Sequence, residues 1–182
     1  MIASAAQESA TRESAAHESV AWPRCNPWRL AWSLSLALAG LWAIEVWPSA
    51  AAVVAPLDEL TAQLTAAMLA VLGVPVLREA VVLVHHGGFA CAITRACTAL
   101  IPAALLAAAV VSQPLPWRTR LIGLFAGTAL VVAVNQIRLV SLVWLGVHTP
   151  ALFQTAHVLV SPALLMLASA GCWWVWLRAA SR

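Results

Sequence analysis

The stretch Leu121–Leu145 reads LIGLFAGTALVVAVNQIRLVSLVWL and contains one charged residue, Arg138, in an otherwise apolar run. A helix needs roughly 20 apolar residues to cross the hydrocarbon core of a bilayer. This stretch is therefore long enough to span a membrane with some tilt, and it indicates that the chain is embedded in a bilayer.

The composition of the whole chain agrees with this interpretation. Of the 182 residues, 63% are hydrophobic and 9% are charged, whereas a soluble domain has about 25% charged residues. The formal net charge of +3 is small and the basic residues are scattered, so the basic stripe of a nucleic-acid surface is absent. The composition excludes a water-soluble enzyme and predicts an all-α, polytopic integral membrane protein.

Three further apolar stretches complete a predicted bundle of about four transmembrane helices. The spans are expected at residues 30–47, 96–111, 121–145 and 157–177, within a membrane domain of residues 25–182. Residues 1–24 form a quasi-repeat of small and charged residues, with too little apolar surface to offset the entropy of ordering. We expect them to form a disordered cytoplasmic tail.

The arginines indicate how the chain is oriented. With four spans and a cytoplasmic amino terminus, seven arginines lie inside, two lie outside and Arg138 lies in the bilayer. If residues 60–77 formed a fifth span, five arginines would lie inside and four outside. Positively charged residues are enriched in cytoplasmic loops. The four-span arrangement is therefore favoured, with residues 48–95 outside the cytoplasm.

This extracytoplasmic segment has two predicted parts. Asp58–Val71 is typical of an amphipathic or interfacial helix, ended by Gly73 and Pro75. Val76–Ile93 alternates and is rich in valine, which predicts a short hairpin whose turn is His85–Gly88.

Three reactive side chains on different predicted helices lie at one depth. Arg138 is seventeen residues beyond Leu121, about 25 Å along the helix and hence in the outer part of the bilayer. Asn135 precedes it by three residues on the same helical face. Cys97 and His157 open spans that both start at the outer surface. Because charged residues within a membrane are costly, Arg138 is a candidate functional residue.

These residue types suit nucleophilic catalysis by a thiol. A free cysteine has a pKa of about 8.5 and needs a nearby base or cation to become a thiolate at neutral pH. His157 can supply the base, and Arg138 can stabilise the thiolate or a developing oxyanion. The pattern predicts a membrane-embedded cysteine hydrolase or acyl transferase with neither a metal nor a cofactor.

Three sequence blocks also resemble the exosortase/archaeosortase family. They are Cys97–Leu100 (CTAL), Asn135–Leu142 (NQIRLVSL) and Gln154–His157 (QTAH). The resemblance extends over about residues 60–177, with Asn-x-x-Arg followed by a later histidine as its most specific part. The family usually has a small polar residue and then glycine after the cysteine, and Thr98 and Ala99 stand at those positions here.

The resemblance implies a cysteine peptidase or transpeptidase of the bacterial cytoplasmic membrane, with its site on the outer side. Cys97, Arg138 and His157 would be catalytic, and Asn135 and Thr98 would support them or bind substrate. The implied partner is the carboxy-terminal sorting tail of an exported protein, made of a short motif, an apolar helix and a basic cluster. Cleavage would proceed through a thioester at the membrane–water interface.

Two other functions remain open at this stage. A non-catalytic accessory subunit of an envelope-polysaccharide or secretion system would have the same hydrophobicity, but it gives no reason for Cys97, Arg138 and His157 to converge. A haem or redox protein could use His157 with His85 or His86, but it would need two histidines on opposite spans at matching depth.

Overall fold

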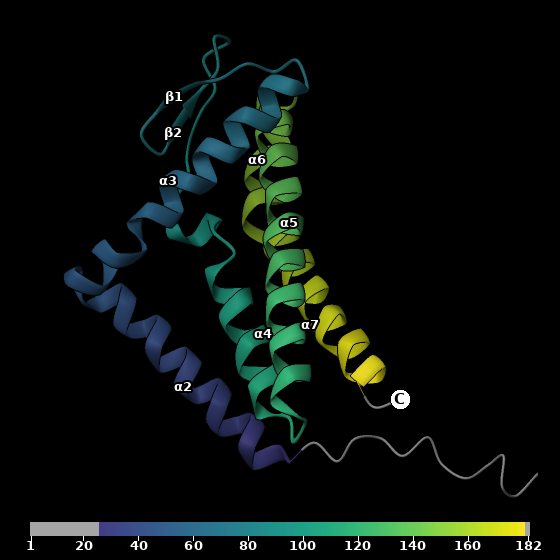
Figure 1. Ribbon diagram of the computed structural model, residues 1–182. Coiled ribbons are helices and arrows are strands. Elements are labelled where there is room, and N and C mark those ends of the chain that lie inside the picture. Colours follow the sequence, from purple (N-terminus) through teal and green to yellow (C-terminus); the bar gives the residue numbers. More distant parts are fainter. Residues whose placement is uncertain (1–25, 181–182) are drawn as a thin grey trace, which may run out of the picture.

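The computed structural model describes residues 26–180, so the predicted tail at residues 1–24 lies outside the described part of the chain. Within that part the chain is helical apart from one small sheet (Figure 1). The elements are α2 (Pro27–Val46), α3 (Pro48–Val71), β1 (Leu77–Glu79), β2 (Val82–Val84), β3 (Ala90–Ala92), the 3-10 turn η1 (Arg95–Cys97), α4 (Leu100–Ser112), α5 (Trp117–His148), α6 (Pro150–Thr155), the π-helical turn η2 (Ala156–Val160) and α7 (Ser161–Ala180).

The long helices form a bundle, and the connections between them lie at its two opposite ends, as in a polytopic membrane protein. Helices α4, α5 and α7 contact one another, and α2 packs on α4. The start of α2, the connection from α4 to α5 and the end of α7 lie at one end of the bundle, while the sheet and α6 lie at the other (Figure 1). Three helices are long and apolar enough to cross a membrane: α2, α5 and the continuous helix Pro150–Ala180. The predicted all-α membrane protein is therefore confirmed.

Helix α4 is shorter, with 13 residues. The span expected at residues 96–111 begins instead with η1, and α4 follows from Leu100. The start of this predicted span is thus a single 3-10 turn and not part of the α-helix, and Cys97 is the last residue of that turn.

Helix α3 is longer than the interfacial helix expected at Asp58–Val71, because it begins at Pro48. Proline suits the first turn of a helix, where the missing N–H would have no intrahelical partner. A second proline, Pro56, lies inside α3 without ending it. The helix ends at Val71, and Gly73 follows with a φ of 76° that favours glycine.

The predicted hairpin is part of a three-stranded antiparallel sheet in the order β1-β2-β3. The turn at His85–Gly88 connects β2 to β3, as the sequence predicts. A second, tighter turn joins Glu79 to Val82 and contains Ala80 at a φ of 52°. Alanine rarely adopts this conformation, so the sequence gives no sign of this turn.

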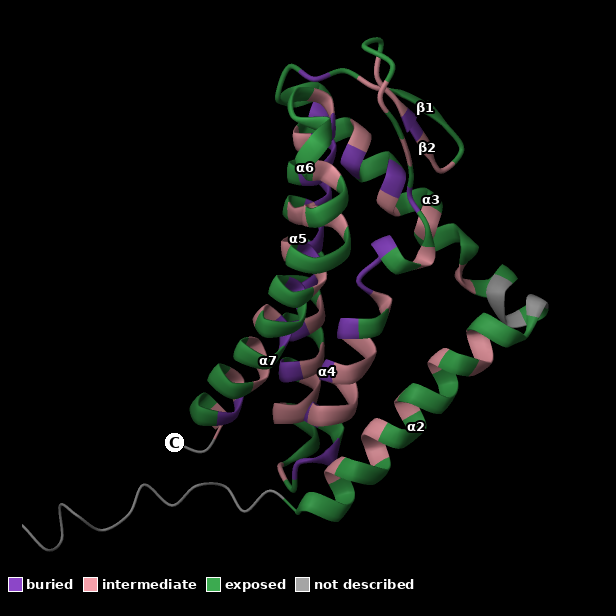
Figure 2. Ribbon diagram, turned by 180° about the vertical axis from the view of Figure 1, so that it is seen from behind, coloured by how far each residue is buried: buried purple, intermediate pink, exposed green. Residues whose placement is uncertain are grey.

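Buried residues form two clusters (Figure 2). One lies where α3, the sheet, η1 and α5 meet, and the other lies between α4, α5 and α7. Helix α2 has no buried residue, although its mean hydropathy is that of a membrane span. Its exposed apolar side chains fit contact with lipid, and the first cluster is the one that contains Cys97.

Candidate functional site

Cys97 ends the 3-10 turn η1, directly before α4. The turn is closed by hydrogen bonds from the Cys97 amide to the Thr94 carbonyl (2.7 Å) and from the Thr98 amide to the Arg95 carbonyl (3.1 Å). The Thr94 hydroxyl lies 3.8 Å from the Cys97 sulfur. The cysteine is therefore held in a compact turn whose backbone hydrogen bonds are made locally.

The thiol-bearing residue is covered. Cys97 is 2% exposed, and its cluster includes Ala62 and Leu69 of α3, Leu83 of β2 and Val143 of α5. Helix α3 is fixed to α5 within this cluster by a buried hydrogen bond of 3.0 Å between the Thr65 hydroxyl and the Gln136 side-chain oxygen. Cys97 is therefore covered by α3, the sheet and α5.

Asn135 joins the cysteine turn to α5. It is 1% exposed, and its Nδ2 donates a hydrogen bond of 2.9 Å to the Cys97 carbonyl. Its Oδ1 accepts a hydrogen bond of 3.1 Å from Nη1 of Arg138. The helical spacing of three residues thus stacks Asn135 and Arg138 as the sequence predicts. One amide side chain is fully used in linking Cys97 to Arg138.

Ser161 joins Arg138 to the helix that carries His157. Nε of Arg138 donates a hydrogen bond of 2.8 Å to the Ser161 hydroxyl. That hydroxyl donates a longer bond of 3.3 Å to the carbonyl of His157. Ser161 is not among the residues that the sequence pattern predicts, although a serine four residues after a candidate histidine is positioned to bond to the preceding turn.

His157 lies in the π-helical turn η2, between α6 and α7. Such single turns inside α-helices are frequent at functional sites. The imidazole stacks on Phe153, with 5.5 Å between ring centroids and 4° between planes. Phe153 in turn meets the edge of Phe89, from the turn after β2, at 5.1 Å. Gly146 of α5 leaves the space that Phe89 fills. The histidine ring is therefore held by the sheet as well as by its own helix.

The structure brings four of the five predicted site residues into one chain of hydrogen bonds, with Ser161 as the added member. That chain runs from Cys97 through Asn135 and Arg138 to Ser161 and the backbone of His157. No hydrogen bond joins the thiol directly to the imidazole among the described residues. In enzymes without substrate, catalytic contacts are often long and tighten only in the complex.

Thr98 lies in the turn that holds Cys97, a position that fits a supporting residue. It is 6% exposed, and its hydroxyl donates to the Arg95 carbonyl at 2.8 Å, which closes the turn around Cys97. Ala99 follows at φ −78° and ψ 11°. Any residue adopts this conformation, so the backbone here has no need of a glycine.

Charged residues surround the cysteine turn on its other side. Nη1 of Arg95 donates a hydrogen bond of 3.0 Å to the carbonyl of Ile44, and it lies 3.9 Å from the carboxylate of Glu45. Burial raises the pKa of Asp58 on α3, and the charge of Glu45 adds to this while Arg95 opposes it. The contacts of Arg95 tie η1 to the carboxy-terminal end of α2.

Cys91 of β3 lies close enough to the site to be affected by it. Its pKa is raised mainly by burial and also by the neighbouring Cys97 thiol. A thiol with a raised pKa is a poor nucleophile near neutral pH. Of the two cysteines, Cys97 is the one that the hydrogen-bonded chain includes.

The described residues do not form any group of three histidine, cysteine or acidic side chains that could hold a metal ion. His85 and His86 have ring centroids 6.3 Å apart in the turn between β2 and β3, and the His85 ring nitrogen accepts the Gly87 amide instead. The pair therefore stabilises a turn.

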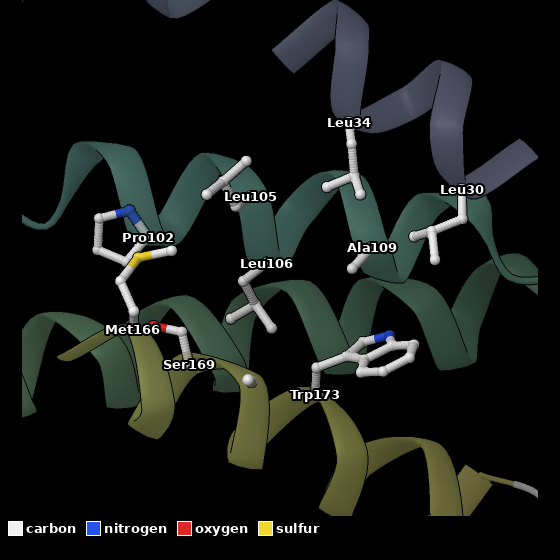
Figure 3. A pocket seen from close by; sticks show the side chains of 10 residues that line it. Leu30, Leu34, Pro102, Leu105, Leu106, Ala109, Met166, Ser169 and Trp173 are labelled. Atoms are coloured by element: carbon white, nitrogen blue, oxygen red, sulfur yellow. The ribbon is translucent and has the colours of Figure 1, made fainter. Parts of the chain in front are cut away.

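Several grooves lie beside the helices. One, of about 220 Å³, is formed by α2, α4 and α7 and has Leu34, Leu106 and Trp173 among its lining residues (Figure 3). It has no ionisable side chain and is lined by none of the five predicted site residues. A second, of about 330 Å³, lies between α5 and the helix formed by η2 and α7, and it includes Arg138 and Ser161 in its wall. A third, of about 220 Å³, lies between α2 and the turn η1 and includes Glu45, Arg95 and Ala96 in its wall. The second and third grooves border the candidate site, from the side of Arg138 and from the side of the cysteine turn.

Comparison with known proteins agrees with this geometry. No curated protein and no solved structure matches the chain. The family described as transmembrane exosortase matches residues 25–174, which include η1, α5 and the π-helical turn. Because this match covers most of the 182 residues, the chain belongs to the transmembrane exosortase family.

Proposed function

We propose that this exosortase is a cysteine peptidase or transpeptidase that cleaves the carboxy-terminal sorting tails of exported proteins. Cys97 is the nucleophile, His157 exchanges protons with it, and Arg138 stabilises negative charge. The substrate is an exported protein whose tail has a short motif, an apolar helix and a basic cluster.

The observation that supports this proposal most strongly is the hydrogen-bonded chain from the Cys97 carbonyl to the His157 carbonyl. It joins a cysteine, an arginine and a histidine from three separate elements at one level of the bundle. An accessory protein needs no such arrangement. Burying an arginine side chain in a membrane bundle is costly unless its N–H groups are hydrogen-bonded. Arg138 makes two such bonds, to Asn135 and Ser161. These two side chains bond in turn to the carbonyls of Cys97 and His157.

The reaction follows from the chemistry of these groups. His157 takes the proton of the Cys97 thiol, and the thiolate attacks the carbonyl carbon of the scissile peptide bond. The C–N bond then breaks, the leaving amine takes the proton from the imidazolium, and a thioester remains on Cys97. An acceptor amine, or water, attacks the thioester and frees the thiol. Arg138 is suited to neutralise the oxyanion that forms in each attack.

The proposed site faces the outside of the bacterial cytoplasmic membrane. This orientation is supported by the arginines at the ends of the helices. Arg29 is in the first turn of α2, Arg118 and Arg120 are in the first turn of α5, and Arg178 is in the last turn of α7. Figure 1 shows these helix ends opposite to the sheet, whose strand β1 contains Arg78. Because arginines are enriched on the cytoplasmic side, the sheet and Cys97 lie outside.

The test is the processing of a tailed protein in cells. An exported protein with such a tail, encoded in the same genome, is co-expressed with the wild type or with Cys97→Ala. We expect Cys97→Ala to abolish cleavage of the tail. Cys172→Ala, which removes a half-buried thiol on α7 away from the site, is the matched control and should leave cleavage intact. Unchanged cleavage by Cys97→Ala would leave an accessory role as the better explanation.

A further inference from the structure

One edge of the sheet is unpaired and leads directly to Cys97. In the described chain, β3 pairs only with β2. The register places Leu83 opposite Cys91, with Val82 opposite Ala92 and Val84 opposite Ala90. Hydrogen bonds from the His85 amide to the Phe89 carbonyl and from the Ile93 amide to the Val81 carbonyl flank this ladder.

These two bonds show which way each backbone group of β3 points. In an antiparallel pair, hydrogen-bonded and non-hydrogen-bonded residue pairs alternate. The pairs at Phe89 and Ile93 are bonded, so the pair at Cys91 is bonded as well, and Ala90 and Ala92 are in the non-bonded pairs. The N–H and C=O groups of Ala90 and Ala92 therefore point away from β2, toward the free edge.

The free edge of β3 is accessible, and the residues along it have small side chains. Ala90 and Ala92 are both exposed, and their methyl groups leave the backbone open to an approaching chain. On the opposite face, Leu83 and Ile93 are buried and Cys91 is half-buried, so the strand is anchored on the cluster that contains Cys97. Five residues after Ala92 comes Cys97 itself, at most about 17 Å along an extended chain.

We propose that the free edge of β3 binds an extended segment of the substrate as a fourth strand and so delivers the scissile bond to Cys97. This proposal rests on the proposed function and identifies where the substrate backbone docks. Two N–H and two C=O groups, spaced as in a β-strand, are complementary to another peptide backbone. Lipid chains have no groups that could pair with them. The chemical class of the occupant is thus an extended peptide, namely the part of the sorting tail that precedes its apolar helix.

The variant Ala92→Pro tests this directly. Proline removes the outward N–H of residue 92, and because that N–H makes no bond to β2, an edge strand tolerates the change. Loss of one backbone hydrogen bond should raise KM for tail cleavage roughly 2- to 10-fold, with kcat little changed. Arg78→Ala, on strand β1 at the opposite edge of the sheet, is the control, and for it we expect the wild-type KM.

Photocrosslinking provides a second readout in a protein whose fold is otherwise unchanged. A photoreactive amino acid is placed at position 90 of the full chain, with Cys97→Ala included so that the tailed substrate accumulates uncut. We expect crosslinks to the substrate segment beside the cleavage point. The same probe at Arg78, on the opposite edge of the sheet, should give none.

The outcomes separate this proposal from the proposed function. A raised KM for Ala92→Pro alone, with crosslinks from position 90, supports docking on β3. A wild-type KM for Ala92→Pro, or crosslinks from position 90 only to lipid or to a second copy of the chain, would overturn it. In either of those cases, loss of cleavage in Cys97→Ala would still uphold the peptidase, whereas cleavage by Cys97→Ala would remove the function itself.

Discussion

The contribution of Asn135 can be predicted quantitatively from its two hydrogen bonds. The variant Asn135→Ala removes the donor to the Cys97 carbonyl and the acceptor of the Arg138 N–H, at a position that is 1% exposed. A buried group that loses its partner costs about 1–3 kcal/mol, and more if it is charged. Two groups lose their partner, so we expect the variant to lose about 2–6 kcal/mol in its free energy of unfolding.

The same substitution should also slow cleavage at temperatures where the variant is folded. Without Asn135 the turn that holds Cys97 is no longer tied to α5, and a displacement of about 1 Å can cost roughly 100-fold in rate. Asn135→Asp keeps the acceptor for Arg138 and loses the donor to Cys97, so it separates the two bonds.

The assay for Asn135 combines thermal unfolding in lipid nanodiscs with cleavage of the tailed reporter at a temperature where each variant is folded. Ile137→Ala is the control, because Ile137 is on the same helix and 61% exposed. A loss of less than about 0.5 kcal/mol for Asn135→Ala, within the range of ordinary surface substitutions, would refute the account of the link. So would wild-type cleavage by that variant.

Three further predictions concern the elements around the site. Gly146→Ala would place a methyl group against the ring of Phe89. We therefore expect this variant to lose about 1–3 kcal/mol in its free energy of unfolding, measured by thermal unfolding, and to cleave more slowly. Gly171→Ala is the control and should be neutral, because its methyl group meets no atom within 4 Å. Thr65→Val breaks the buried bond between α3 and α5 and should speed alkylation of the covered thiol, measured by mass spectrometry; an unchanged rate would show that α3 does not control access. Burial raises the pKa of Asp58, so its charged form destabilises the fold at neutral pH. Asp58→Asn should therefore unfold at a higher temperature than the wild type at pH 7, and this advantage should disappear as the pH falls below the Asp58 pKa.

Much of the architecture could be predicted because the bilayer constrains it strongly. Apolar runs of sufficient length identify α2, α5 and the helix that ends in α7. Helical periodicity stacks Asn135 on Arg138, and their bond in the structure follows from it. These features depend on local sequence and on one solvent property, the absence of water in the hydrocarbon core.

Other features depend on contacts between distant residues. The sequence does not reveal that Pro56 is tolerated inside α3 or that Ala80 adopts a positive φ, because both are set by the tertiary structure. The expectation that the outer end of the α4 span is helical was wrong for a related reason. Cys97 instead lies in a 3-10 turn, held by a bond from Asn135 that no local pattern encodes.

The role of Ser161 and the aromatic support of His157 were also beyond the sequence. A serine within an apolar helix does not form a recognisable sequence motif. Ser161 has a role here because it accepts a hydrogen bond from the Arg138 side chain of another helix. Similarly, Phe89 comes from the turn between β2 and β3, and Phe153 comes from α6. Gly146 of α5 leaves the space that the Phe89 ring occupies.

The central claim is that Cys97 forms a thioester with the substrate. Intact-protein mass spectrometry of the wild-type enzyme, quenched in acid during turnover of the tailed reporter, measures this directly. We predict an adduct with the mass of the substrate fragment that precedes the cleaved bond, located on the peptide containing Cys97 and released by hydroxylamine. Cleavage of the reporter without any such adduct, or with an adduct that persists in Cys97→Ala, would contradict the account.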